Sequence, residues 1–114
     1  MSVFVVEVEA DGPVPGLYSM VSFAAVRLQE PALDCAFVGR VRPTSDLYVP
    51  EALSVSGVTR EQHWAFEAPQ QVMPRFAQWL AEHSAGRPVF VSDNPAFDWQ
   101  FINYYLWRYT GGNP

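Results

Sequence analysis

The chain has 114 residues, of which 49% are hydrophobic and 15% aromatic, and this composition predicts one domain with a packed core rather than a disordered segment. Twelve acidic and seven basic residues, all of the latter arginine, give a net charge of −5 and exclude the broad basic surface that binds nucleic acid through charge alone. No apolar run approaches the roughly 18 residues that cross a bilayer, no leader-like segment opens the chain and Cys35 has no disulfide partner, so we expect a cytoplasmic protein without a membrane anchor.

The first predicted strand lies within residues 3–12, VFVVEVEADG, and ends in acidic side chains at every second position. Its apolar run is typical of a central strand that is buried on both faces. Side chains alternate along a strand, so Glu7, Glu9 and Asp11 share one face if the extended conformation continues. An isolated E-x-E pattern is usually a solvated face, but acidic residues that end a buried strand indicate a further role.

Two more strands are predicted at residues 18–28 and 35–41. The segment PVPG, residues 13–16, has turn chemistry, and Pro31 and Pro43 mark breaks. Connections this short are too brief for parallel crossovers. The first three strands therefore form an antiparallel meander.

Residues 50–64 have an irregular pattern, with a loop or short helix at 54–59. A helical apolar stripe follows, formed by Val72, Phe76, Trp79, Leu80 and His83. Pro69 suits the first turn of this helix, whereas Pro74 means that the regular helix begins near Gln70 or kinks at Pro74. Gly86 ends it.

A strand within residues 87–94 and a final helix complete the pattern, which is that of an α/β domain. We expect Asn94 to cap this helix, Pro95 to occupy its first position and Gly111 to end it. The helix carries seven aromatic residues: Phe97, Trp99, Phe101, Tyr104, Tyr105, Trp107 and Tyr109. Such a set invites base stacking, but most must be core, and we expect Phe97, Phe101, Tyr104 and Tyr105 to face inward.

The first turn of this helix carries Asp98, where the helix dipole favours a negative charge. Together with Glu7 and Glu9 it forms a set of hard oxygen ligands that suits Mg²⁺ or Mn²⁺. Asp11 is either a spare ligand or a turn residue. We interpret His63 and His83 as structural, since neither has a carboxylate at motif spacing.

Three segments resemble the DEDD 3'-5' exonucleases, and the likeness covers essentially the whole chain. EVEADG, residues 7–12, is similar to the family's first motif, D-x-E-x-x-G, at the end of the first strand. DNPAFDW, residues 93–99, is similar to the second motif, N-x-x-F-D, and PEALSVSGVTREQ, residues 50–62, resembles the segment between them. The small RNA-directed members are the most similar in pattern.

This resemblance implies an RNase H-like exonuclease fold, in which a mixed sheet that begins with the antiparallel meander is flanked by helices. It also implies hydrolysis of phosphodiesters with two Mg²⁺ or Mn²⁺ ions, held by Glu7, Glu9 and Asp98. Asp11, Gly12 and Phe97 would contact the terminal nucleotide, with Gly12 allowing close backbone approach. The expected substrate is a single-stranded 3' end, of RNA more than of DNA.

Two departures from the family pattern bear on activity. Position 7 holds Glu where the family has Asp, and the extra methylene moves the carboxylate outward by about 1.5 Å. The family's third motif, a His base followed by an Asp, would lie beyond the last helix, so we expect residues 1–114 to be a single domain that is incomplete at its C-terminus, either a fragment of a longer enzyme or a non-catalytic binding or assembly module. Exposed aromatics near Trp107 and Tyr109 further predict a homodimer.

Overall fold

Four strands form one mixed sheet in the computed structural model, which describes residues 2–28 and 35–114. They are β1 (Ser2–Ala10), β2 (Met20–Leu28), β3 (Ala36–Arg40) and β4 (Pro88–Val91), in the spatial order β3-β2-β1-β4. The first three are antiparallel neighbours and β4 is parallel to β1, which confirms the predicted meander and mixed sheet. The predicted break near Pro31 lies outside the described residues.

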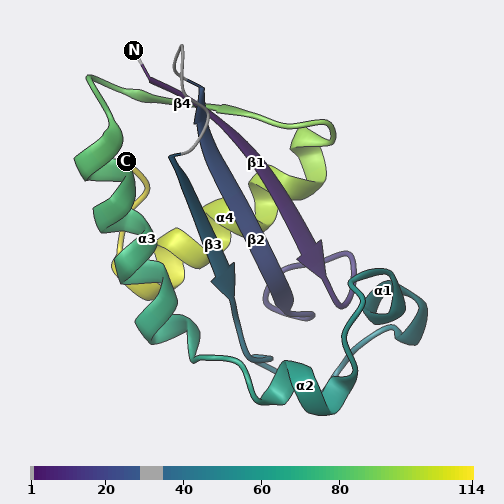
Figure 1. Ribbon diagram of the computed structural model, residues 1–114. Coiled ribbons are helices and arrows are strands. Elements are labelled where there is room, and N and C mark those ends of the chain that lie inside the picture. Colours follow the sequence, from purple (N-terminus) through teal and green to yellow (C-terminus); the bar gives the residue numbers. More distant parts are fainter. Residues whose placement is uncertain (1, 29–34) are drawn as a thin grey trace.

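Two long helices, α3 (Pro69–His83) and α4 (Pro95–Thr110), pack on one face of the sheet and against each other (Figure 1). The core between these layers consists of buried side chains from the sheet and both helices: Phe4, Val6, Val8, Phe23, Val72, Met73, Phe76, Phe101, Ile102, Tyr105 and Leu106. In the described part of the chain, no helix has both the length and the apolar character needed to cross a membrane.

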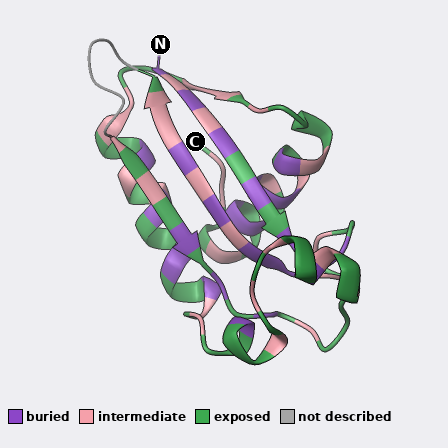
Figure 2. Ribbon diagram, turned by 45° about the vertical axis from the view of Figure 1, so that its right-hand side comes forward, coloured by how far each residue is buried: buried purple, intermediate pink, exposed green. Residues whose placement is uncertain are grey.

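No helix from residues 2–28 or 35–114 covers the other face of the sheet, and every second residue of β1 is only half-buried or exposed, so the prediction that β1 is buried on both faces is wrong. Buried and less buried residues alternate along β1 (Figure 2). Phe4, Val6 and Val8 face the helices, whereas Val3 and Val5 are only half-buried. The continuous apolar run reflects a strand whose second face is lined by small and β-branched residues of its neighbours.

The irregular segment holds two short helices, α1 (Pro50–Val55) and α2 (Arg60–Trp64), beyond the end of β1 (Figure 1). Residues 54–59, where a loop or short helix was expected, comprise the last two residues of α1 and the loop that joins α1 to α2. A capping box fixes the start of α2: the Thr59 hydroxyl accepts from the Gln62 N–H at 3.1 Å, and the Gln62 side chain accepts from the Thr59 N–H at 2.9 Å.

The ends of the long helices match the sequence pattern only in part. Helix α3 begins at Pro69 and runs through the exposed Pro74. Asn94 stands at the N-cap position of α4, but its side chain makes no capping hydrogen bond. Gly111 ends α4 in the left-handed conformation at φ 82°, as predicted. Tyr104, expected in the core, is 36% exposed instead.

Candidate functional site

The edge strand β4 is shorter than its neighbour β1, and this difference in length creates the candidate site. β4 pairs only with the first part of β1, from Ser2 to Val5, so the last residues of β1 have no strand on that side. The chain leaves the sheet after Val91 and returns as the first turn of α4. There the Asp98 carboxylate accepts a hydrogen bond from the Val8 N–H at 3.2 Å and replaces a strand partner.

This hydrogen bond brings Asp98 beside the two glutamates of β1. Asp98 is 6% exposed and lies in the first turn of α4, where the helix dipole stabilises its charge. Glu7 and Glu9 flank Val8 on the exposed face of β1. Partial burial raises the pKa of Glu9, and the negative charges of Glu7 and Asp98 raise it further. Glu7 and Asp98 therefore lie close enough to Glu9 to repel its negative charge.

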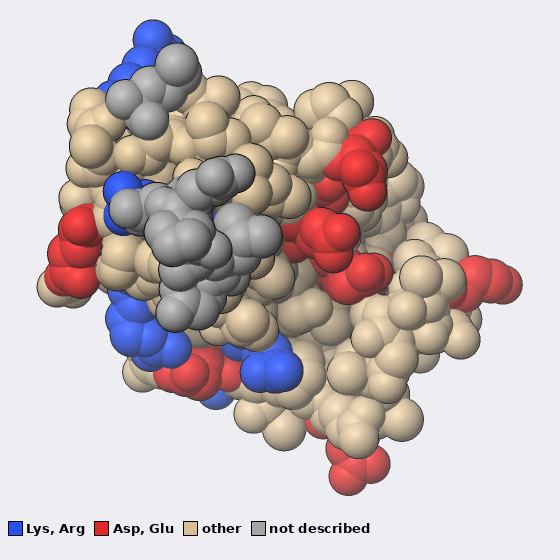
Figure 3. Space-filling view, turned by 45° about the horizontal axis from the view of Figure 1, so that its top comes forward, with Lys and Arg blue, Asp and Glu red and all other residues tan. Residues whose placement is uncertain are grey.

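The donor set suits a hard divalent cation, although it does not form a closed metal cage. Within residues 2–28 and 35–114, no three His, Cys, Asp or Glu side chains converge closely enough to hold an ion. Glu7 and Glu9 are exposed and can rotate, whereas Asp98 is fixed. The largest group of acidic atoms in Figure 3 lies toward the right of that view, apart from the arginines at its left.

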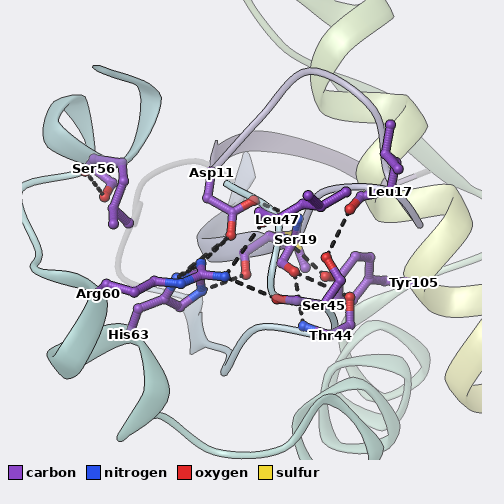
Figure 4. Close-up of polar contacts among 12 residues, drawn as sticks. Asp11, Leu17, Ser19, Thr44, Ser45, Leu47, Ser56, Arg60, His63 and Tyr105 are labelled. Atoms are coloured by element: carbon purple, nitrogen blue, oxygen red, sulfur yellow. Dashed lines mark hydrogen bonds and ion pairs between the residues drawn. The ribbon is translucent and has the colours of Figure 1, made fainter. Parts of the chain in front are cut away.

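Asp11 does not share the face of Glu7 and Glu9, which corrects the expectation for a continuous strand. The pairing of β1 with β2 is irregular between Glu9 and Ala10, and Asp11 turns inward to complete burial. One carboxylate oxygen accepts from the Ser19 N–H at 2.6 Å, and the other from Arg60 at 2.5 Å (Figure 4). Both carboxylate oxygens are thus engaged within the protein, which favours the turn residue over the spare ligand. Contact of Asp11 with a nucleotide remains a prediction.

His63 is fully buried beside Asp11 and Arg60. Asp11 is distant in sequence, so motif spacing did not predict this neighbour. Its Nε2 lies 3.2 Å from the Met20 carbonyl oxygen, which can only accept, so Nε2 carries the proton. Its Nδ1 then accepts from Arg60 Nη1 at 3.2 Å. Burial lowers the pKa of His63 and keeps the ring neutral. The structural interpretation of His63 agrees with this environment.

His83, interpreted as structural, donates from Nδ1 to the Trp79 carbonyl oxygen at 2.8 Å. It lies in the last turn of α3, where it satisfies a carbonyl at the helix end. The site therefore contains no histidine in the part of the chain that the structure describes.

The lowered pKa of His63 predicts acid sensitivity. A depressed folded-state pKa contributes stability that is present above the unfolded value near 6.5 and is lost as pH falls through the folded-state value. We expect His63→Gln, which can still donate to Met20, to lose less of its melting temperature between pH 7 and pH 5 than the native chain. His83→Gln serves as the control. Parallel losses in the native chain and the His63 variant would contradict a buried neutral His63.

Gly12 and Phe97, the other two residues expected to bind substrate, both make packing contacts within the protein. Gly12 is buried, and a Cβ there would overlap the ring of Tyr18, so close packing in the turn already accounts for a glycine. Phe97 is half-buried and packs against Phe101, with ring centroids 5.2 Å apart. Substrate contacts by Gly12 and Phe97 remain predictions.

Arg60 is the residue of this region that sequence reasoning missed. Its guanidinium donates to the Asp11 carboxylate and to the carbonyl oxygens of Ser45 and Leu47. The capping pattern T-x-x-Q, residues 59–62, could have predicted α2 and placed an arginine on its first turn. Nothing in the local pattern pairs that arginine with residue 11.

The chain is similar in sequence to one protein named as an exonuclease and in structure to exonuclease I. No protein-family model matches the chain. An Escherichia coli protein, "3'-5' DNA exonuclease Cap18", is 39% identical over 112 residues, which cover 96% of this chain and 59% of that protein. E. coli exonuclease I in complex with a dT13 oligonucleotide gives a TM-score of 0.77 at 20% identity, covering 94% of this chain and 24% of the enzyme. Its zinc-bound complex with single-stranded DNA gives 0.76 with the same identity and coverage. These likenesses confirm the predicted fold.

Proposed function

The chain belongs to the DEDD-type 3'-5' exonuclease family, and from this premise we propose that it carries the metal-binding face of a nuclease that removes nucleotides from 3' ends of single-stranded DNA. The sequence relative is named a DNA exonuclease and spans more residues than this chain. The activity is therefore proposed for residues 1–114 as one incomplete domain of such a nuclease.

The position of Asp98 beside the end of β1 carries this proposal. Val8 donates its N–H to Asp98 at 3.2 Å, and the glutamates on either side of Val8 belong to the family's first motif. Residues of the two segments that resemble family motifs thus lie together where β1 extends past β4, which supports the proposal. Their mutual repulsion favours binding of a cation, because a divalent ion offsets the negative charges.

The three carboxylates have separate proposed roles. Asp98 is the fixed ligand, since its hydrogen bond and its place in α4 orient the side chain. Glu9 and Glu7 would be the ligands supplied by β1, with Glu9 on the ion that activates the attacking water and Glu7 at the position where the family has Asp. Two Mg²⁺ or Mn²⁺ ions, when bound, supply an activated water and stabilise the leaving 3' oxygen.

A labelled single-stranded oligonucleotide tests the activity and its polarity. We expect 5'-labelled DNA to shorten stepwise from its 3' end in Mn²⁺ and to stay intact in EDTA. Asp98→Asn keeps the acceptor for Val8 but loses the charge, so it should be inactive while folded. RNA of the same sequence tests the RNA preference that the sequence pattern predicts. Cleavage by Asp98→Asn at the native rate would overturn the proposal.

A non-catalytic binding or assembly module is the second candidate. It is favoured by Glu7, which stands where the family pattern has Asp. Such a module would bind single-stranded DNA, measured by fluorescence anisotropy, without shortening it in Mn²⁺. Equal binding in Mn²⁺ and EDTA would separate this function from a nuclease.

Self-association through α4 is a further prediction. Trp107 is 58% exposed on α4, and Tyr109 on the same helix is half-buried. Large aromatic rings contribute strongly when an interface excludes water. We expect light scattering to report a dimer that Trp107→Ala weakens, with Trp99→Ala, another exposed tryptophan of α4, as the control. A monomer at every concentration would contradict the homodimer.

A further inference from the structure

Asp11 joins the end of β1 to three other segments of the chain. Its N–H donates to the Ser19 carbonyl oxygen at 2.8 Å, and its side chain accepts from the Ser19 N–H. Its own carbonyl oxygen accepts from the Val49 N–H at 2.7 Å, and its second carboxylate oxygen accepts from Arg60. Every polar group of this buried residue is therefore bonded, two positions after Glu9.

Arg60 carries the contact between Asp11 and α2 (Figure 4). Nη1 donates to the Asp11 carboxylate at 2.5 Å, while Nη2 donates to the Ser45 carbonyl oxygen at 2.9 Å. The planar guanidinium spans these partners at once, a geometry that lysine cannot reproduce. A single side chain thus fixes the β1 end, the segment before α1, and α2 relative to one another.

Two aromatic rings partly shield this guanidinium from solvent. The Arg60 guanidinium carbon lies 4.4 Å from the ring centroid of Tyr48 and 5.5 Å from that of Trp64. The Arg60 side chain is 16% exposed and Asp11 is fully buried. Partial exclusion of water strengthens the ion pair and limits its motion. The guanidinium nevertheless remains reachable from solvent.

The end of β1 needs this attachment because regular pairing fails there. Glu9 pairs with Ser22, but Ala10 pairs with Met20, so the ladder skips one residue of β2 beside the candidate ligand. Beyond this irregularity, Asp11 and its partners replace the strand ladder as the constraint on the backbone. A shift of Asp11 would therefore be transmitted to Glu9 through Ala10, the one residue between them.

We propose that Arg60 is a positioning residue for the metal site, because it holds the end of β1 through Asp11 and thereby sets the backbone that carries Glu9. The proposal rests on the proposed function of Glu9 as a metal ligand. Arg60 itself touches neither Glu9 nor Asp98. Loss of the partners that orient a ligand typically lowers metal affinity by about 10- to 100-fold.

Chemical rescue tests this role. In Arg60→Ala we expect Mn²⁺ affinity, measured by calorimetry, to fall about tenfold, the lower end of that range. Amide exchange at residues 10–19 in EDTA should become faster, and millimolar methylguanidinium should restore both quantities. Arg60→Lys keeps the charge, and its Mn²⁺ affinity and amide exchange rates should lie between those of the native chain and those of Arg60→Ala. This variant also serves as the test if the alanine variant folds poorly. Arg75→Ala removes an exposed ion pair with Glu67 and should change nothing.

The possible outcomes are distinguishable. Lower thermal stability with unchanged Mn²⁺ affinity in both Arg60 variants would overturn the positioning role. So would rescue of the melting temperature by methylguanidinium without rescue of Mn²⁺ affinity. If the native chain itself binds no Mn²⁺, the proposed function fails. If the native chain and the Arg60 variants bind Mn²⁺ equally well, only the positioning role of Arg60 fails.

Discussion

Replacing Glu9 by glutamine is expected to lower Mn²⁺ affinity at least about a hundredfold, the upper end of the loss found when only a supporting residue is removed. Glutamine keeps the length of the side chain but cannot balance the charge of the ion. Nuclease activity, where the native chain shows it, should fall at least as far. The measurement is Mn²⁺ titration by calorimetry at neutral pH.

The same substitution is expected to raise the melting temperature of the metal-free protein. The folded-state pKa of Glu9 is raised, so its stabilising contribution is present below the unfolded value of about 4.5 and is lost as pH rises through the folded value. At neutral pH the ionised side chain therefore opposes folding, and glutamine removes this repulsion. Stability and metal binding thus change in opposite directions.

Glu82→Gln is the matched control for both effects, since Glu82 lies on α3 and accepts only from Gln78 among the contacts of the described chain. It should alter neither Mn²⁺ affinity nor the melting temperature appreciably. A Glu9→Gln protein that melts lower than the native chain in EDTA, or that keeps its Mn²⁺ affinity, would contradict the repulsive carboxylate site.

Replacing Phe101 by alanine is expected to cost about 3–5 kcal/mol of unfolding free energy, the usual loss for a buried phenylalanine. The Phe101 ring is fully buried one turn after Asp98, in the core between α4 and the sheet. A domain of this size has a total stability of only about 5–15 kcal/mol. Urea denaturation should therefore show a midpoint shifted far toward zero.

Two variants separate packing from helix propensity in that experiment. Phe101→Leu keeps most of the buried volume and should lose much less stability. Trp107→Ala removes a larger ring from an exposed position on the same helix and, at concentrations where the chain is monomeric, should stay within about 0.5 kcal/mol of the native chain. Equal losses at Phe101 and Trp107 would show that α4 is not anchored by its buried face.

The meander and the ends of α4 were predictable from sequence because their determinants are local. Short connections allow only antiparallel neighbours, and Pro95 and Gly111 mark helix ends by their own backbone preferences. The same holds for Asp98, whose place in the first turn follows from the position of Pro95. Each of these features is determined by residues that lie within it or next to it in the sequence.

Features that depend on distant partners were not predictable. Asp11 has the spacing of a third surface carboxylate, but the Ser19 N–H and Arg60, 49 positions later, hold its side chain inward. The apolar run of β1 matches a strand buried on both faces, yet helices cover one face. Tyr104 was expected to face inward with its neighbours but lies at the margin of the core. The face of α4 that contacts the core is too narrow to bury all of the helix's aromatic side chains.

The hydrogen bond from Val8 to Asp98 joins residues 90 positions apart, and this separation has a kinetic consequence. Contacts of such long range form late, since the chain must first close a large loop. The acidic site is therefore assembled only after the meander has formed and α4 has docked. A bound cation would then slow unfolding and leave the folding rate almost unchanged, because the transition state precedes the site that it stabilises.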